Sequence, residues 1–175
     1  MFFKKYTPKE AVKSLVINAV IASAYVVLTV LNFNFSYGAI QFRISEMLVL
    51  ICFFRPDTII GLTLGCLLAN ANAAANPMFL SDMLFGTLGT FISCLLMIYM
   101  PRLLLGAIMP IVVNAFVVGA ELYFVLEQPF WFSVGMVGLG QLVVIAVGYI
   151  VFLFLMRNKK FMDIIGATRH REVKW

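Results

Sequence analysis

Charged residues are scarce in this chain of 175 residues. Asp, Glu, Lys and Arg make up 12% of it, hydrophobic residues make up 63%, and the mean hydropathy is +1.01. A soluble domain carries about 25% charged residues and has no means of burying so much apolar surface. The scarcity of charge therefore excludes a soluble globular protein and favours a protein that lies in a lipid bilayer.

Regular alternation of polar and apolar residues is also lacking. Membrane-spanning β-barrels require that alternation in every strand, whereas the apolar runs here are continuous and long. Continuous runs are typical of helices, whose backbone groups hydrogen-bond within the segment. We therefore predict an all-α integral membrane protein that forms one domain over residues 1–175.

Motifs for covalent chemistry or energy supply are absent as well. The sequence has no G-x-x-x-x-G-K-[ST] phosphate loop, no nucleophile elbow and no zinc-binding helix. Its three cysteines lack metal-ligand spacing, and its single histidine, His170, lies in a basic tail. We expect no enzymatic activity, no cofactor and no metal site in this chain. The net charge of +5 is explained by basic ends that favour anionic lipid, so we expect no nucleic-acid partner.

Six apolar stretches are candidates for membrane-spanning helices. They cover residues of about 12–31, 42–54, 58–75, 79–99, 103–126 and 131–156. Because a helix needs roughly 20 residues to cross the bilayer core, the second and third stretches are short. We expect one or both to be tilted, partly re-entrant or shielded by neighbours. Between them, Arg55-Pro56-Asp57 predicts a water-exposed turn.

The basic residues predict the orientation of the chain. If six segments cross the bilayer, both termini and the turns at 55–57 and 100–102 lie on one side. That side then carries all but one of the 13 basic residues, and the opposite side carries only Arg43. The positive-inside rule therefore places both termini in the cytoplasm. The residues on the cytoplasmic side are Lys4, Lys5, Lys9, Lys13, Arg55, Arg102, Arg157, Lys159, Lys160, Arg169, Arg171 and Lys174.

Polar residues inside the apolar stretches gather at the predicted extracellular level. Arg43 and Glu46 are three residues apart and share a helix face, and Asn114 and Glu121 are two helical turns apart. Ionisable residues in a membrane segment indicate a functional site, and a one-sided cluster predicts a ligand cup that opens outward. The candidate ligand-binding residues are Arg43, Glu46, Asn70, Asn72, Asp82, Asn114, Glu121, Trp131 and Gln141.

Two of these assignments have simpler alternatives. The Arg43–Glu46 pair can serve only to hold the second segment in place, although this leaves Asp82 and Glu121 without a cation. Trp131 can be an interfacial belt residue, because aromatic rings prefer the membrane surface. A cluster that only pins helices together would indicate a structural subunit.

Small residues form a strip on the first segment. Asn18, Ala19, Ala22 and Ser23 recur at helical spacing, and small side chains let helices approach closely in lipid. The strip either packs within the protein's own bundle or faces a partner protein. We treat Ala19, Ala22 and Ser23 as the candidate docking residues.

Three runs of sequence resemble the QueT family: Ile40-Gln41-Phe42-Arg43-Ile44-Ser45-Glu46, Gly65-Cys66-Leu67-Leu68-Ala69-Asn70 and Asp82-Met83-Leu84-Phe85-Gly86-Thr87-Leu88. QueT proteins are substrate-binding S components of energy-coupling factor (ECF) transporters for queuosine precursors. The resemblance implies a six-helix protein of the bacterial cell membrane that captures its ligand outside the cell. It also implies three partners: the coupling subunit EcfT and the ATPases EcfA and EcfA', which hydrolyse the ATP. S components typically present an Ala-x-x-x-Ala face to the coupling subunit, where this chain has Ala19 and Ser23.

The ligand implied by the resemblance is a 7-deazaguanine, which presents two adjacent N–H donors beside a carbonyl. A carboxylate can accept both donors, and an amide or an arginine can reach the carbonyl. Glu46, Asp82 and Glu121 are the available acids, and which acid takes which group stays open. The alternatives are an S component for another small nutrient or vitamin, and a membrane transporter that works alone.

Overall fold

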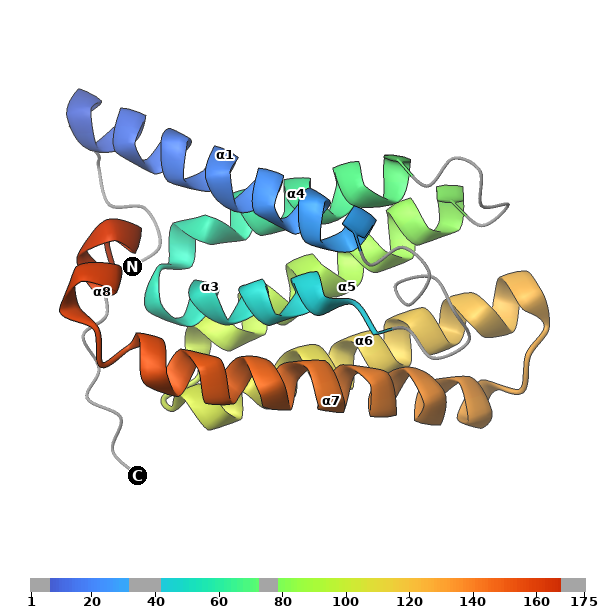
Figure 1. Ribbon diagram of the computed structural model, residues 1–175. Coiled ribbons are helices and arrows are strands. Elements are labelled where there is room, and N and C mark those ends of the chain that lie inside the picture. Colours follow the sequence, from blue (N-terminus) through green and yellow to red (C-terminus); the bar gives the residue numbers. More distant parts are fainter. Residues whose placement is uncertain (1–6, 32–41, 73–78, 168–175) are drawn as a thin grey trace.

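The computed structural model describes residues 7–31, 42–72 and 79–167. Every regular element in these ranges is a helix, as the continuous apolar runs predicted. The elements are α1 (Pro8–Leu31), η1 (Ile44–Leu50), α3 (Ile51–Phe54), η2 (Pro56–Thr58), α4 (Ile59–Asn72), α5 (Phe79–Tyr99), α6 (Leu103–Leu126), α7 (Phe130–Leu155) and α8 (Lys159–Ile165). Figure 1 shows them as a bundle in which successive long segments run back and forth.

Four helices, α1, α5, α6 and α7, are long and apolar enough to cross a membrane. Their bounds agree with the first, fourth, fifth and sixth predicted stretches to within about four residues, the usual uncertainty of helix ends read from sequence. The break between α5 and α6 contains Pro101, and α6 ends where Glu127 adopts a left-handed conformation (φ 54°), two residues before Pro129, the N-cap residue of α7. The chain is therefore a multi-pass membrane protein.

The second and third predicted stretches form two shorter apolar helices, Ile44–Phe54 and Pro56–Ala71. The first begins as the 3-10 helix η1 and continues as α3, so it reaches only about 20 Å, against the roughly 30 Å of a bilayer core. It lies in the centre of the bundle, where η1 contacts α1, α4, α5, α6 and α7. Its residues Val49, Leu50 and Cys52 are fully buried. The prediction of shielding is thus confirmed for this segment, because protein rather than lipid surrounds it.

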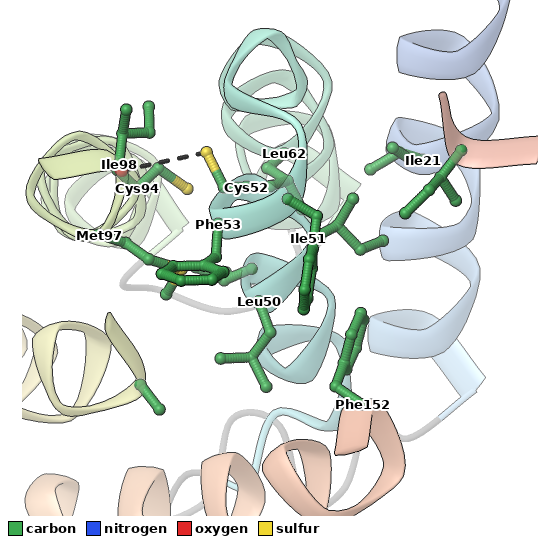
Figure 2. Close-up of a cluster of buried hydrophobic side chains, with 14 of the residues drawn as sticks. Ile21, Leu50, Ile51, Cys52, Phe53, Leu62, Cys94, Met97, Ile98 and Phe152 are labelled. Carbon is green, nitrogen blue, oxygen red and sulfur yellow. Dashed lines mark hydrogen bonds between the residues drawn. The ribbon is translucent and has the colours of Figure 1, made fainter. Parts of the chain in front are cut away.

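The apolar core surrounds α3. Phe53 and Phe54 of α3 are nearly fully buried, and the ring of Phe54 stacks on Phe152 of α7 with centroids 6.1 Å apart. Figure 2 shows Phe53 beside Met97 of α5. The three cysteines are free thiols buried in the protein, which is the usual environment of a small apolar residue.

The helices α1 and α4 pack closely through small residues. A Cβ atom at Gly65 would lie 3.0 Å from the Cα atom of Ala22, and the Gly61 N–H donates to Asn18 Oδ1 over 2.7 Å. Ala19 and Ser23, on the opposite side of the strip, are exposed. The structure therefore divides the small-residue strip between an internal face and an outer face.

One end of the bundle, here called the basic end, holds the start of α1, the turn at 55–57 and α8 (Figure 1). Arg55 is only 5% exposed, because its guanidinium binds both carboxylate oxygens of Asp57, at 2.7 and 2.8 Å, and donates to the Ile165 carbonyl over 2.7 Å. The Ser14 hydroxyl donates to the same Asp57 carboxylate. The turn predicted at this position exists, but the prediction that it is water-exposed is wrong for Arg55, which α8 covers.

Candidate functional site

Four ionisable side chains are buried toward the opposite end of the bundle. The exposed fractions are 4% for Arg43, 2% for Glu46, 3% for Asp82 and 0% for Glu121. Arg43 is extended and caps η1, Asp82 lies in the first turn of α5, and Glu121 lies near the end of α6. The Arg43 guanidinium is within electrostatic reach of both the Asp82 and Glu121 carboxyl groups. Three chain segments thus bring the three predicted acids and the predicted arginine into one polar cluster.

Glu46 is held by hydrogen bonds from two other helices. The hydroxyl of Tyr25, on α1, donates to Glu46 Oε1 over 2.6 Å, and Asn114 Nδ2, on α6, donates to Glu46 Oε2 over 3.5 Å. Tyr25 is completely buried, and the next turn of α1 adds a hydrogen bond of 2.7 Å between Thr29 Oγ1 and Ser45 Oγ. Sequence reasoning did not select Tyr25. Its spacing of four residues from Thr29, inside an apolar helix, was the available signal.

Two glycines of α5 make room for the polar side chains. A Cβ atom at Gly86 would lie 2.9 Å from Asn70 Nδ2 and 3.4 Å from an Arg43 terminal nitrogen. A Cβ atom at Gly89 would collide with Asn114 Oδ1. Because only glycine lacks that atom, side chains from η1, α4 and α6 can approach the surface of α5 at this level. The Gly86–Gly89 notch is therefore part of the site's architecture.

Several buried acceptor atoms in the cluster have no hydrogen-bond donor in the part of the chain that the structure describes. Asn70 donates through Nδ2 to the Asp82 carbonyl over 2.8 Å, which leaves its Oδ1 unpartnered. Buried polar atoms are normally hydrogen-bonded, and each exception requires an explanation. The atoms concerned in the cluster are Asn70 Oδ1, Asn114 Oδ1 and both Glu121 carboxylate oxygens, and Gln141 Oε1 on α7 is a further buried acceptor of this kind. All of them accept hydrogen bonds, so a bound molecule rich in N–H or O–H donors would satisfy them.

The remaining predicted residues lie in three different situations. Gln141 is buried on α7, two turns from Gly148, which packs against Met47 of η1. The side chain of Asn72 lies outside the described residues. Trp131 is 75% exposed at the start of α7, with its ring edge-on to Phe130 at 5.1 Å. The structure does not bring Trp131 into the polar cluster, and its exposure is typical of an interfacial belt residue.

The polar cluster shows no metal-ligand arrangement. Across residues 7–31, 42–72 and 79–167, no three His, Cys, Asp or Glu side chains are placed to hold a metal ion together. The side chains of the polar cluster offer hydrogen bonding and charge pairing. Such a site can bind and orient a polar molecule in an apolar surrounding.

The helices and the buried cluster define a multi-pass membrane protein with a polar site enclosed among its helices. The family model described as QueT transporter matches residues 15–157, a range that includes every candidate ligand and docking residue. The chain belongs to the QueT transporter family. An alignment of 150 positions to "Queuosine precursor transporter QueT" from Lactococcus lactis subsp. cremoris (strain MG1363) has 31% identity and covers 74% of this chain and 84% of the relative. No solved structure matches the chain.

Proposed function

We propose that this chain is the substrate-binding S component of an ECF transporter and that it binds a queuosine precursor of the 7-deazaguanine type. Two findings support the proposal: the relative named as a queuosine precursor transporter and the buried acceptors for which the described residues provide no donor. We also propose that the ligand is taken up from outside the cell, an orientation supported by the basic residues, which predict cytoplasmic termini if six segments cross the bilayer. The site then lies at the extracellular level and forms the cup from which the ligand is taken.

The buried acceptors carry this proposal. A 7-deazaguanine offers the N1–H group and the 2-amino group side by side, with the O6 carbonyl next to them. Glu121 supplies two free carboxylate oxygens at full burial, and the Arg43 guanidinium can donate to a carbonyl. Hydrogen bonds to a buried ionised group are worth about 1.5–3 kcal/mol each, more than bonds between neutral groups. The donor and acceptor pattern of the site thus matches this ligand class.

Equilibrium binding to the purified chain tests the proposal without any partner protein. We would titrate the detergent-solubilised protein with 7-aminomethyl-7-deazaguanine, 7-cyano-7-deazaguanine, riboflavin and thiamine. Saturable binding of a deazaguanine and none of either vitamin is the expected result. Binding of a vitamin alone would indicate an S component for another nutrient. No binding of any of the four would contradict the proposal.

The energy for uptake would come from partner subunits. The sequence contains no phosphate loop, and we propose that the ATPases EcfA and EcfA' hydrolyse ATP and act through EcfT. The candidate docking face is the outer side of α1, where Ala19 and Ser23 are exposed one turn apart. Small exposed residues at this spacing allow a partner helix to approach closely in lipid.

A pair of substitutions on α1 tests the docking face. Ala19→Trp should abolish uptake by the assembled transporter and leave ligand binding to the isolated chain unchanged, because the added ring blocks only the outer face. Ala22→Trp is the matched contrast. Since Ala22 packs against Gly65, the large ring should lower the yield of folded protein. Normal uptake by Ala19→Trp would place the docking face elsewhere.

A further inference from the structure

The three buried acids of the polar cluster have different surroundings. Glu46 has a donor at each carboxylate oxygen: the Tyr25 hydroxyl at 2.6 Å and Asn114 Nδ2 at 3.5 Å. Glu121 is 0% exposed, and neither of its oxygens has a donor within the described residues. Its polar neighbours are Ser81 and Asp82 at the start of α5. The acids therefore do not share one role.

Folding alone does not explain Glu121. Burying a carboxyl group without a hydrogen-bond partner is unfavourable, and the second acid beside it adds repulsion whenever both are ionised. Glu46 needs no such explanation, because its bonds from α1 and α6 join three segments of the bundle. Among the residues that the structure describes, no side chain supplies both Glu121 oxygens with donors, so a bound ligand is a candidate donor.

We propose that Glu121 is the specificity-determining residue of the site and accepts the two adjacent N–H donors of the ligand, while Glu46 is a positioning residue held by Tyr25. This inference rests on the proposed function, since it assumes a ligand of the guanine type. Neither Glu121 oxygen has a donor in hydrogen-bond geometry among the described residues, although Ser81 and Asp82 lie nearby, so the carboxylate can receive the N1–H and the 2-amino group together as a planar fork. The Arg43 guanidinium, within electrostatic reach of Glu121, keeps a cation beside the bound edge.

Asn114 links Glu46 to the face of α6 that carries Glu121. It lies seven residues before Glu121 on α6 and therefore on the same helix face. Its amide is oriented by Glu46, which accepts from Nδ2, and its Oδ1 faces the Gly89 position of α5. Glu46 thus acts on the site through Asn114 and through the placement of η1. Tyr25 acts one step further away, through Glu46.

The test compares two ligands that differ by a single group. 7-Deazaguanine carries the 2-amino group, and 7-deazahypoxanthine lacks it. For the parent protein we expect the loss of this group to weaken binding by roughly ten- to a hundred-fold, the range of one charge-assisted hydrogen bond. In Glu121→Gln the ratio of the two dissociation constants should fall to within about threefold, because the amide nitrogen cannot accept the second donor.

Glu46→Gln and Tyr25→Phe are the matched controls. Both alter the neighbouring acid or its tyrosine, and both should keep the full discrimination against 7-deazahypoxanthine. A second control compares 7-aminomethyl-7-deazaguanine with 7-deazaguanine. The added group lies away from the N1–H and the 2-amino group, so it should change the dissociation constant by the same factor in the parent and in Glu121→Gln.

The outcomes are distinguishable. A parent-like ratio in Glu121→Gln, or a ratio that collapses in Glu46→Gln instead, would overturn the assignment and leave the proposed function intact. A parent protein that binds none of the three deazapurines would contradict the proposed function itself. If Glu121→Gln is not recovered folded, Glu121→Asp replaces it in the test. The aspartate side chain is shorter by one methylene, so its carboxylate should no longer reach both donors, and the ratio should fall. An unchanged ratio in that variant would overturn the assignment equally.

Discussion

Arg43 and Arg55, the two arginines buried in the described part of the chain, lie at opposite ends of the bundle and differ in what surrounds them. At the basic end, Arg55 donates hydrogen bonds to the Asp57 carboxylate and to the Ile165 carbonyl, and the Ser14 hydroxyl donates to Asp57 as well. Around Arg43 there are three acids, and acceptor atoms without donors accompany them. A cluster in which donors and acceptors match holds helices together. A cluster with surplus acceptors is incomplete without a ligand, which is how binding sites differ from structural ones.

The largest expected difference between the two ends is their side of the membrane. Single cysteines replacing Lys160, in α8, and Glu127, beyond the end of α6, should show all-or-none labelling by a membrane-impermeant thiol reagent added to intact cells. Position 127 should react and position 160 should not, because the basic residues predict that the basic end is cytoplasmic. The parent chain serves as the control, since its three thiols are buried. Labelling of position 160 from outside would reverse the orientation.

The next effect is on stability at the basic end. Arg55→Met should lower the free energy of unfolding by about 3 kcal/mol, because it removes the buried cation that pairs with the partly buried Asp57 carboxylate. Arg102→Met removes an exposed arginine and should change stability by no more than about 0.5 kcal/mol. Reversible unfolding in mixed micelles measures both. Deazaguanine affinity, measured on the folded fraction, should stay at the parent value in both variants. An Arg55→Met protein as stable as the parent would show that this cluster is not structural.

Stability should move in the opposite direction at the other end. Glu121→Gln replaces an unpartnered buried acid by a neutral amide of the same shape, so the ligand-free protein should gain about 1–2 kcal/mol. Glu127→Gln, at an exposed position, should change nothing measurable. The same micelle unfolding assay, run without ligand, gives the sign. A loss of stability in Glu121→Gln would mean that the carboxylate is already satisfied in the free protein.

The smallest effect concerns the notch in α5. Gly86→Ala and Gly89→Ala place a Cβ atom against Asn70 and Asn114, which should displace these amides and weaken ligand binding about tenfold, in line with mild overpacking. Gly135→Ala is the matched control, because nothing lies within 4 Å of a Cβ atom there. Parent-like affinity in both notch variants would remove Gly86 and Gly89 from the site's architecture.

Sequence reasoning found the features that local patterns determine. The four long helices follow from runs of about 20 apolar residues, and the family follows from the run that ends in Arg43-Ile44-Ser45-Glu46. The gathering of Arg43, Glu46, Asp82 and Glu121 was also predictable. Ionisable residues rarely face lipid, and all four were expected at the same depth.

Contacts between distant segments were not predictable in the same way. Arg55 is covered by α8, whose Ile165 is 110 positions further along the chain, so the charged turn gave no sign of burial. Ala19 and Ala22 are equally small, and only the position of Gly65 on α4 decides which of them is internal. Glu46 and Glu121 are chemically identical in sequence. What distinguishes Glu46 is its hydrogen bonds from Tyr25 on α1 and Asn114 on α6, which both lie outside its own segment.

The central position of Ile44–Phe54 has a consequence for how the protein is made. The segment is short, follows Arg43 and contains Glu46, and each ionisable group opposes entry into lipid by a few kcal/mol on insertion scales. Its surroundings include α5, α6 and α7, which leave the ribosome after it. The segment therefore reaches its final environment only when the later helices have been synthesised. The site is formed at that stage of biogenesis. A chain interrupted before α6 would present these charges to lipid, where they are unfavourable.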